Sequence, residues 1–384
     1  MINADKIVEM AHALTGLPHF EGSSGYVRLG EFVEVANRYG RLSESSEGLI
    51  EGGLINSLMV RLQIESYVHT HPELAAQRIE RPVFVLGMQR SGTTLVHRLL
   101  AADPGRRYLM NWEAAHPAPP AAPGGQHADP RCTLKRRLQE IELKYRPSRA
   151  VLHWEYADEP TECGAALAYD FTGWSVHPLF RDPAHIDAAL ALDMTSSYRF
   201  HKTILQILQS NNPGAWILKW PTHAVYVSAL LAVYPDARLI WTHRDPYRVV
   251  ASALSLAEMF ARACLDSDCV TELGVLSQHV PRMLSEYVRR LMRVHQEHGN
   301  NRLYDLHYAR LLRNPLQEME RLYKWLGEDF SSQARERVTQ WLQTNPQGLH
   351  GRHDYSLGRF GRSVEDLQPL FEEYRKSYDV ELER

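Results

Sequence analysis

The spacing of apolar residues changes near residue 80. Before this point an apolar stripe recurs every four positions, which predicts an amphipathic helix. The stripe consists of Ile50, Leu54, Leu58 and Leu62. From Pro82 onward, short apolar runs typical of buried strands alternate with helical patterns, which predicts a parallel sheet flanked by helices. We therefore expect an α/β fold, with an N-terminal helical extension over residues 1–80 and a main domain over residues 81–384.

Residues 82–94 predict a strand, a loop of small residues and the start of a helix. They read Pro-Val-Phe-Val-Leu-Gly-Met-Gln-Arg-Ser-Gly-Thr-Thr. The small residues Gly87, Ser91 and Gly92 leave room for backbone N–H groups to surround phosphate oxygens, and the helix N-terminus adds a partial positive charge. This segment therefore predicts an anion-binding loop, although an unrelated turn between a strand and a helix is the alternative.

The loop has the glycine spacing of a nucleotide P-loop, but its positively charged side chain stands at a different position. The triphosphatase pattern requires a lysine after the second glycine, where this chain has Thr93, and the charge stands instead at Arg90. In triphosphatases that lysine contacts the β and γ phosphates, and the next hydroxyl holds magnesium. The loop therefore predicts a P-loop-like site that does not hydrolyse ATP or GTP, and a P-loop kinase or triphosphatase stays as the alternative.

Residues 237–254 predict a second strand that leads into a helix. The apolar run ends at His243, and Pro246 stands near the start of the helical pattern. Arg244 lies at the junction, and Ser252 follows eight residues later. A guanidinium can donate to two oxygens of a terminal phosphate, and a hydroxyl supplies a further donor. We therefore expect a second phosphate site here.

Together the two segments resemble the sulfotransferases that use 3′-phosphoadenosine 5′-phosphosulfate (PAPS), in particular their bacterial and tyrosylprotein-sulfotransferase-like branch. The resemblance implies that residues 81–384 form a sulfotransferase catalytic domain. It also implies in-line transfer of the sulfuryl group from PAPS to a hydroxyl or amine of a small or lipid-like acceptor, with adenosine 3′,5′-bisphosphate (PAP) as product. The donor-binding residues carried over from these two segments are Gln89, Arg90, Ser91, Gly92, Thr93, Thr94, Arg244 and Ser252.

Three further segments resemble motifs of the same family. Lys219 begins a K-x-P element, which in the family lies at the edge of the sulfate site. Tyr308 begins a Y-x-x-L-x-x-x-P segment, which implies a contact with adenine. Residues 353–361 resemble the H-x-Y-S-L-x-x-F-G stretch, where Arg352 and Arg359 supply charge suited to a bound phosphate. A strand-ending surface lysine, a core tyrosine and a solvated basic loop are the alternatives.

The resemblance also implies catalytic roles. Arg90 would neutralise charge on the leaving phosphate, and Lys219 would hold the sulfuryl oxygens. Glu113 resembles the catalytic glutamate of the tyrosylprotein branch, although its distance from Arg90 in the sequence is longer here. His223 is the rival general base, but it follows Lys219 by four residues instead of two. We prefer Glu113 as the base.

Other polar and irregular segments leave two interpretations open. The acidic residues Asp158, Glu159 and Glu162 favour the start of a helix, where acids complement the helix dipole, and contact with the substrate is the alternative. The Pro-rich stretch over residues 114–130 is too irregular for a helix or strand. It predicts either part of the acceptor wall or a passive connector.

Composition limits the partners more than it identifies them. A net charge of -3 and a pI near 6.7 give no reason to expect nucleic acid. The chain has four cysteines without C-x-x-C spacing, no signal peptide pattern and no apolar run long enough for a membrane segment. These features favour a cytoplasmic protein. They are compatible with peripheral contact at a membrane. We expect no metal requirement, because the sulfuryl group carries one negative charge. The sequence is compatible with a homodimer, and a catalytically inactive nucleotide-binding protein stays as a further alternative.

Overall fold

The centre of the protein is a parallel sheet. The computed structural model describes residues 1–20, 23–39, 44–145, 155–172, 183–264, 273–346 and 356–383. In this part of the chain the sheet has five strands in the order β2-β3-β1-β4-β5, all paired in parallel. The strands are β1 (Val83–Gly87), β2 (Arg106–Tyr108), β3 (Ala215–Lys219), β4 (Arg238–His243) and β5 (Leu303–His307). The predicted parallel sheet is confirmed.

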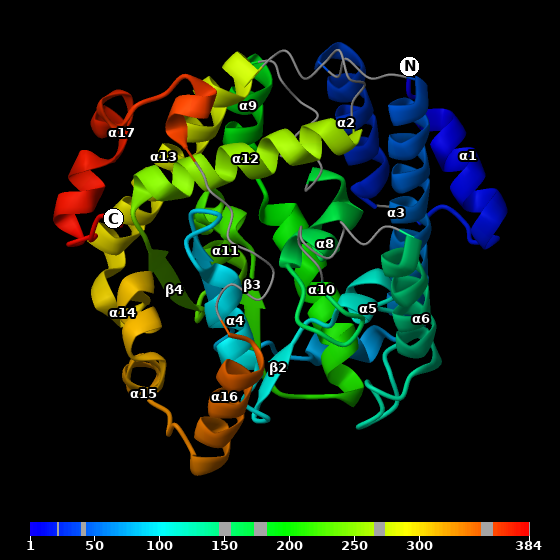
Figure 1. Ribbon diagram of the computed structural model, residues 1–384. Coiled ribbons are helices and arrows are strands. Elements are labelled where there is room, and N and C mark those ends of the chain that lie inside the picture. The colour runs from blue at the N-terminus through cyan, green and yellow to red at the C-terminus, as the bar shows by residue number, and fades with distance from the viewer. Residues whose placement is uncertain are drawn as a thin grey trace.

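Helices cover both faces of the sheet (Figure 1). Successive residues of β1 point to opposite faces, so Phe84 joins one apolar core and Val85 the other. Because both faces are covered, the central strand β1 is apolar and buried along its whole length. The helices of the first core are α10 (Thr195–Asn211), α11 (Val227–Val233), α12 (Pro246–Cys264), α13 (Leu273–His298) and α17 (Val364–Ser377). Those of the second are α4 (Thr93–Ala101), α14 (Tyr308–Arg313), α15 (Pro315–Leu326) and α16 (Ser332–Thr344).

The N-terminal helices pack around an apolar core of their own. They are α1 (Ala4–Thr15), α2 (Gly25–Tyr39) and α3 (Glu44–Thr70). Helix α3 carries the predicted stripe, and all four of its residues are buried. Arg61 of α3 reaches beyond this core, where its Nη1 donates to Asp170 Oδ1 over 2.7 Å. A buried ion pair therefore links the N-terminal helices to the rest of the protein, and the predicted boundary at residue 80 stays a prediction.

Other helices of the described residues include four short ones and one longer one. They are α5 (Asn111–Ala115), α6 (Pro130–Tyr145), α8 (Cys163–Leu167), α9 (Pro183–Ala191) and the 3-10 helix η5 (Pro221–Ala224). The Pro-rich stretch between α5 and α6 forms neither helix nor strand, as expected. Within the described residues, no helix has both the length and the apolar character needed to span a bilayer.

Candidate active site

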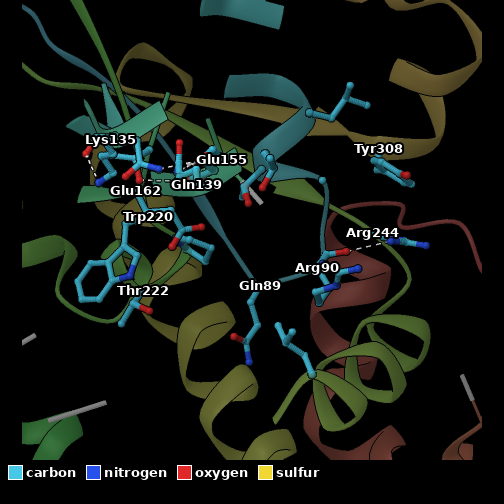
Figure 2. A pocket seen from close by; sticks show the side chains of 18 of the residues that line it. Gln89, Arg90, Lys135, Gln139, Glu155, Glu162, Trp220, Thr222, Arg244 and Tyr308 are labelled. Carbon is cyan, nitrogen blue, oxygen red and sulfur yellow. Dashed lines mark hydrogen bonds between the residues drawn. The ribbon is translucent and has the colours of Figure 1, made fainter. Parts of the chain in front are cut away.

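A cavity of about 860 Å³ lies at the carboxyl ends of the strands. This is the edge at which parallel sheets bind ligands, because the loops that leave the strands meet there. Figure 2 shows two groups of labelled side chains on opposite sides of the cavity. Arg90, Arg244 and Tyr308 form the first group, which we call the basic end. The second group, the carboxylate end, consists of Lys135, Gln139, Glu155, Glu162, Trp220 and Thr222.

The loop that follows β1 needs its glycines. Gly87 and Gly92 have φ angles of 137° and 99°, which side-chain-bearing residues rarely adopt. A Cβ at Gly92 would lie 2.4 Å from Cδ2 of Tyr308, and one at Gly87 would lie 2.8 Å from Oγ1 of Thr242. The chain therefore turns tightly enough to start α4 at the cavity, with Thr93 and Thr94 in its lining.

Ser91 belongs to this loop but does not line the cavity. Its N–H donates to the carbonyl of Met88, and its hydroxyl lies 2.5 Å from the same carbonyl and 2.6 Å from Oγ1 of Thr242. Ser91 is fully buried. Its side chain is therefore engaged with the loop and with β4, whereas Gln89, Arg90 and Gly92 do line the cavity.

Arg90 joins the two predicted phosphate sites. Its Nε donates to the Ser252 hydroxyl over 3.1 Å, and its carbonyl oxygen accepts from Nη1 of Arg244 over 2.9 Å. Arg244 also forms a two-point ion pair with Glu383, and its guanidinium lies 4.5 Å from the ring centroid of Tyr308. One N–H of each Nη atom of Arg244 is not used by these bonds. The basic end can therefore still offer Arg244 donors to an anion.

Lys219 reaches the cavity through two partners. It ends β3 and is fully buried, and its Nζ donates to Oε1 of Glu162 over 2.6 Å. The same Nζ lies 3.5 Å from Oγ1 of Thr94. Both partners line the cavity, whereas Lys219 itself stands behind them. The predicted helix start at Asp158 and Glu159 is wrong, because α8 begins only at Cys163 and Pro160 forms a bridge with Met110. Glu162 lines the cavity, so the alternative, a place in the site, applies to it.

The two predicted general bases lie outside the cavity lining. Glu113 is only 1 % exposed, and its carboxylate accepts from Nη2 of Arg107 over 2.6 Å and from the N–H of Met110 over 3.3 Å. His223 is fully buried, and its Nδ1 lies 2.6 Å from the hydroxyl of Tyr198. Burial lowers the pKa of His223 well below its usual value. Both assignments stay predictions, and the burial of the two side chains argues against them.

Of the two C-terminal arginines predicted to bind phosphate, only Arg359 lies within the described residues. Arg359 belongs to a 3-10 helix, η8 (Leu357–Phe360), and forms an ion pair with Glu258 over 2.7 Å. It does not line the cavity. Arg352 lies outside the described residues.

Comparisons with known proteins decide the family. A model described as "Sulfotransferase family" matches residues 82–332, which is more than half of the chain. The chain belongs to the sulfotransferase family.

Curated relatives and solved structures agree with this assignment. The omega-hydroxy-beta-dihydromenaquinone-9 sulfotransferase Stf3 of Mycobacterium tuberculosis is 24% identical over 310 residues, which are 78% of this chain and 74% of that protein. The crystal structure of sulfotransferase STF9 from Mycobacterium avium is 34% identical, with a TM-score of 0.92 over 100% of this chain and 98% of that one. Sulfotransferase STF1 from Mycobacterium tuberculosis is 27% identical, with a TM-score of 0.82 over 96% of this chain and 98% of that one.

These comparisons confirm the predicted family, fold class and activity. This sulfotransferase transfers sulfuryl groups, and PAPS is the standard donor in its family. The alternative of a P-loop kinase or triphosphatase is not favoured. Among the described residues, no group of three or more His, Cys, Asp or Glu side chains could hold a metal ion.

Replacing Glu113 of this sulfotransferase with glutamine tests whether it is catalytic or structural. We expect the free energy of unfolding, measured in urea, to fall by about 2–3 kcal/mol, because the change removes the charged partner of a buried arginine. The rate of sulfuryl transfer should stay close to that of the unmodified enzyme. Loss of a general base would instead reduce that rate about 100-fold or more without a matching loss of stability.

Proposed function

We propose that this sulfotransferase moves the sulfuryl group of PAPS to a hydroxyl group of a lipid-like acceptor. The donor occupies the basic end of the cavity, and the acceptor enters at the carboxylate end. The observation that carries the proposal is the double contact of Arg90, whose side chain meets Ser252 and whose carbonyl meets Arg244. Two loops suited to phosphate thereby meet in one site.

The donor half of the proposal rests on charge and on the start of α4. The 5′-phosphosulfate lies against the loop from Gln89 to Thr94, where the helix N-terminus and Arg90 supply positive charge. Arg244 and Ser252 bind the 3′-phosphate, and Tyr308 lies close to the adenine. Arg90 stabilises the charge that grows on the leaving phosphate.

The acceptor half rests on Glu162. This carboxylate lines the cavity and is held by Lys219, which also lies next to Thr94 of the phosphate loop. The oxygen of the acceptor hydroxyl forms a bond to sulfur while Glu162 accepts the proton of that hydroxyl. The bond between sulfur and the bridging oxygen breaks, and its electron pair leaves with PAP. Lys219 orients Glu162 from behind the cavity wall.

The lipid-like acceptor is supported by a relative and by the cavity wall. Stf3 is named for transfer to a hydroxylated menaquinone, which is a long apolar molecule. In this chain the cavity wall includes Leu95, Leu138, Trp220 and Leu256. An apolar acceptor gains free energy by contact with such a wall.

An Arg244→Ala variant tests the donor half. We expect the affinity for PAP, measured by calorimetry, to fall about 10- to 100-fold, because charge-assisted hydrogen bonds to a phosphate contribute about 1.5–3 kcal/mol. Adenosine 5′-phosphate, which lacks the 3′-phosphate, should lose much less affinity than PAP, because Arg244 reaches it only through the backbone of Arg90. Arg313→Ala is a matched control, because Arg313 is exposed and lies on α14, outside the cavity lining. Equal losses for both nucleotides, or tight binding of ATP with magnesium in place of PAP, would contradict the proposal.

A further inference from the structure

We propose that helix α6 binds the surface of a bilayer with anionic headgroups and so turns the mouth of the cavity toward the membrane. The inference rests on the proposed lipid-like acceptor and goes beyond it, because it assigns a docking surface to the enzyme. In Figure 1, α6 is the teal helix at the right of the molecule.

One face of α6 is apolar and exposed. Four of the large apolar side chains of α6 are spaced by four, three and four residues, which places them on one side of the helix. We call this set the α6 stripe, and its members are Leu134, Leu138, Ile141 and Tyr145. Their exposed fractions are 59%, 57%, 53% and 76%. An exposed and continuous apolar row of this kind marks a surface that contacts a partner or a membrane.

The stripe has a flank with a net positive charge, in which the exposed Glu140 stands between two basic residues. Arg137 and Lys144 are both exposed and stand seven residues apart, so they share one side of the helix next to the stripe. Lys144 Nζ also lies 6.0 Å from the ring centroid of Tyr145. Apolar residues beside basic ones are the pattern of helices that lie in the interface of an anionic membrane. The flank therefore favours negatively charged headgroups over a second protein surface.

The other side of the stripe belongs to the cavity. Lys135, Gln139 and Glu142 line the cavity from α6, and Leu138 belongs both to the lining and to the stripe. The α6 stripe is thus continuous with the rim of the carboxylate end. An acceptor embedded in the bilayer could reach this end while its apolar part stays in contact with lipid.

Contacts on the buried side and on the cavity side of α6 fix the helix to the protein. Cys132 is buried, and Arg136 forms an ion pair with Asp158 over 2.7 Å. Lys135 Nζ donates to the carbonyl of Asn111 over 2.9 Å, and Gln139 Nε2 donates to the carbonyl of Glu155 over 2.8 Å. The helix therefore presents its stripe from a fixed position.

A double variant with Leu134→Glu and Ile141→Glu tests this surface, because neither residue lines the cavity. We expect the unmodified enzyme to sediment with vesicles that contain phosphatidylglycerol and phosphatidylcholine, and less with phosphatidylcholine alone. The double variant should bind the anionic vesicles about tenfold or more weakly, since two apolar contacts are replaced by charges that anionic headgroups repel. Added salt should weaken binding of the unmodified enzyme, because it screens the net positive charge of the flank.

The matched control carries the same changes on the opposite side of the molecule. Val364→Glu with Leu370→Glu alters two exposed apolar residues of α17, which lies at the left of Figure 1. This variant should bind vesicles as the unmodified enzyme does, and both double variants should keep their affinity for PAP. Absence of vesicle binding by the unmodified enzyme, or equal binding by both double variants, would overturn the proposal. So would a dimer in solution that only the α6 variant disrupts, with no vesicle binding.

These outcomes separate the docking surface from the proposed acceptor. If vesicles bind through α6 but no hydroxylated lipid is sulfated, the proposed acceptor is wrong and the surface stands. If a detergent-dispersed lipid acceptor is sulfated but vesicles do not bind, the surface is wrong and the acceptor stands.

Discussion

An Arg90→Ala variant is expected to lose about 1,000-fold in kcat/KM for sulfuryl transfer, because a positioned arginine contributes about this much to the transfer of a charged group. Arg90 contacts both Ser252 and Arg244 from the phosphate loop. Its loss removes positive charge where the leaving oxygen gains negative charge. Initial rates with radiolabelled PAPS measure the effect.

An Arg90→Lys variant is the control for charge. Lysine keeps the positive charge but lacks the planar fork and the Nε donor that meets Ser252. We expect its activity to lie between those of the alanine variant and the unmodified enzyme. The proposed role of Arg90 is wrong if the alanine variant keeps more than about a tenth of the activity, since so small a loss is below that of a single catalytic donor.

The second large effect is expected at Glu162. A Glu162→Gln variant keeps the shape of the side chain but cannot accept the proton, so kcat should fall about 1,000-fold, within the range of general-base catalysis. The acid limb of the pH–rate profile should disappear with it, because this limb reports protonation of the base. Binding of PAP should be retained.

Glu155→Gln provides the matched control for Glu162. Glu155 also lines the cavity, and its Oε2 accepts from the hydroxyl of Thr161 over 2.5 Å. We expect this variant to keep most of its activity and its pH profile. If Glu162→Gln is active while Glu113→Gln has lost transfer at unchanged stability, the base predicted by family resemblance is correct and our proposal is wrong.

The sequence was most informative where local chemistry determines structure. The apolar run before Gly87 and the small residues after it predicted a strand followed by a phosphate loop, and the structure has both. The same holds for the junction at Arg244, because a strand end and a following proline are local signals. Both sites then meet because parallel strands place their carboxyl ends at one edge of the sheet.

The sequence was least informative where a role depends on a distant partner. Glu113 and Glu162 are both glutamates near the start of a short helix, and no local pattern separates them. The difference comes from Arg107, which binds Glu113 in the interior, and from Lys219, which holds Glu162 at the cavity across 57 positions of the chain. The place of Ser91 also depends on a distant partner, because its hydroxyl forms a hydrogen bond with Thr242 of β4.

The double contact of Arg90 also makes the two ends of the nucleotide depend on each other. A ligand group that binds Arg244 and shifts its side chain also affects the backbone of Arg90, to which Arg244 donates. A group that binds the Arg90 side chain likewise affects Ser252. Binding at either half therefore positions the residues of the other half. The binding free energies of two truncated nucleotides should sum to less than that of the intact nucleotide. Discrimination in favour of the intact donor then arises from cooperation between its ends as well as from the contacts at each end.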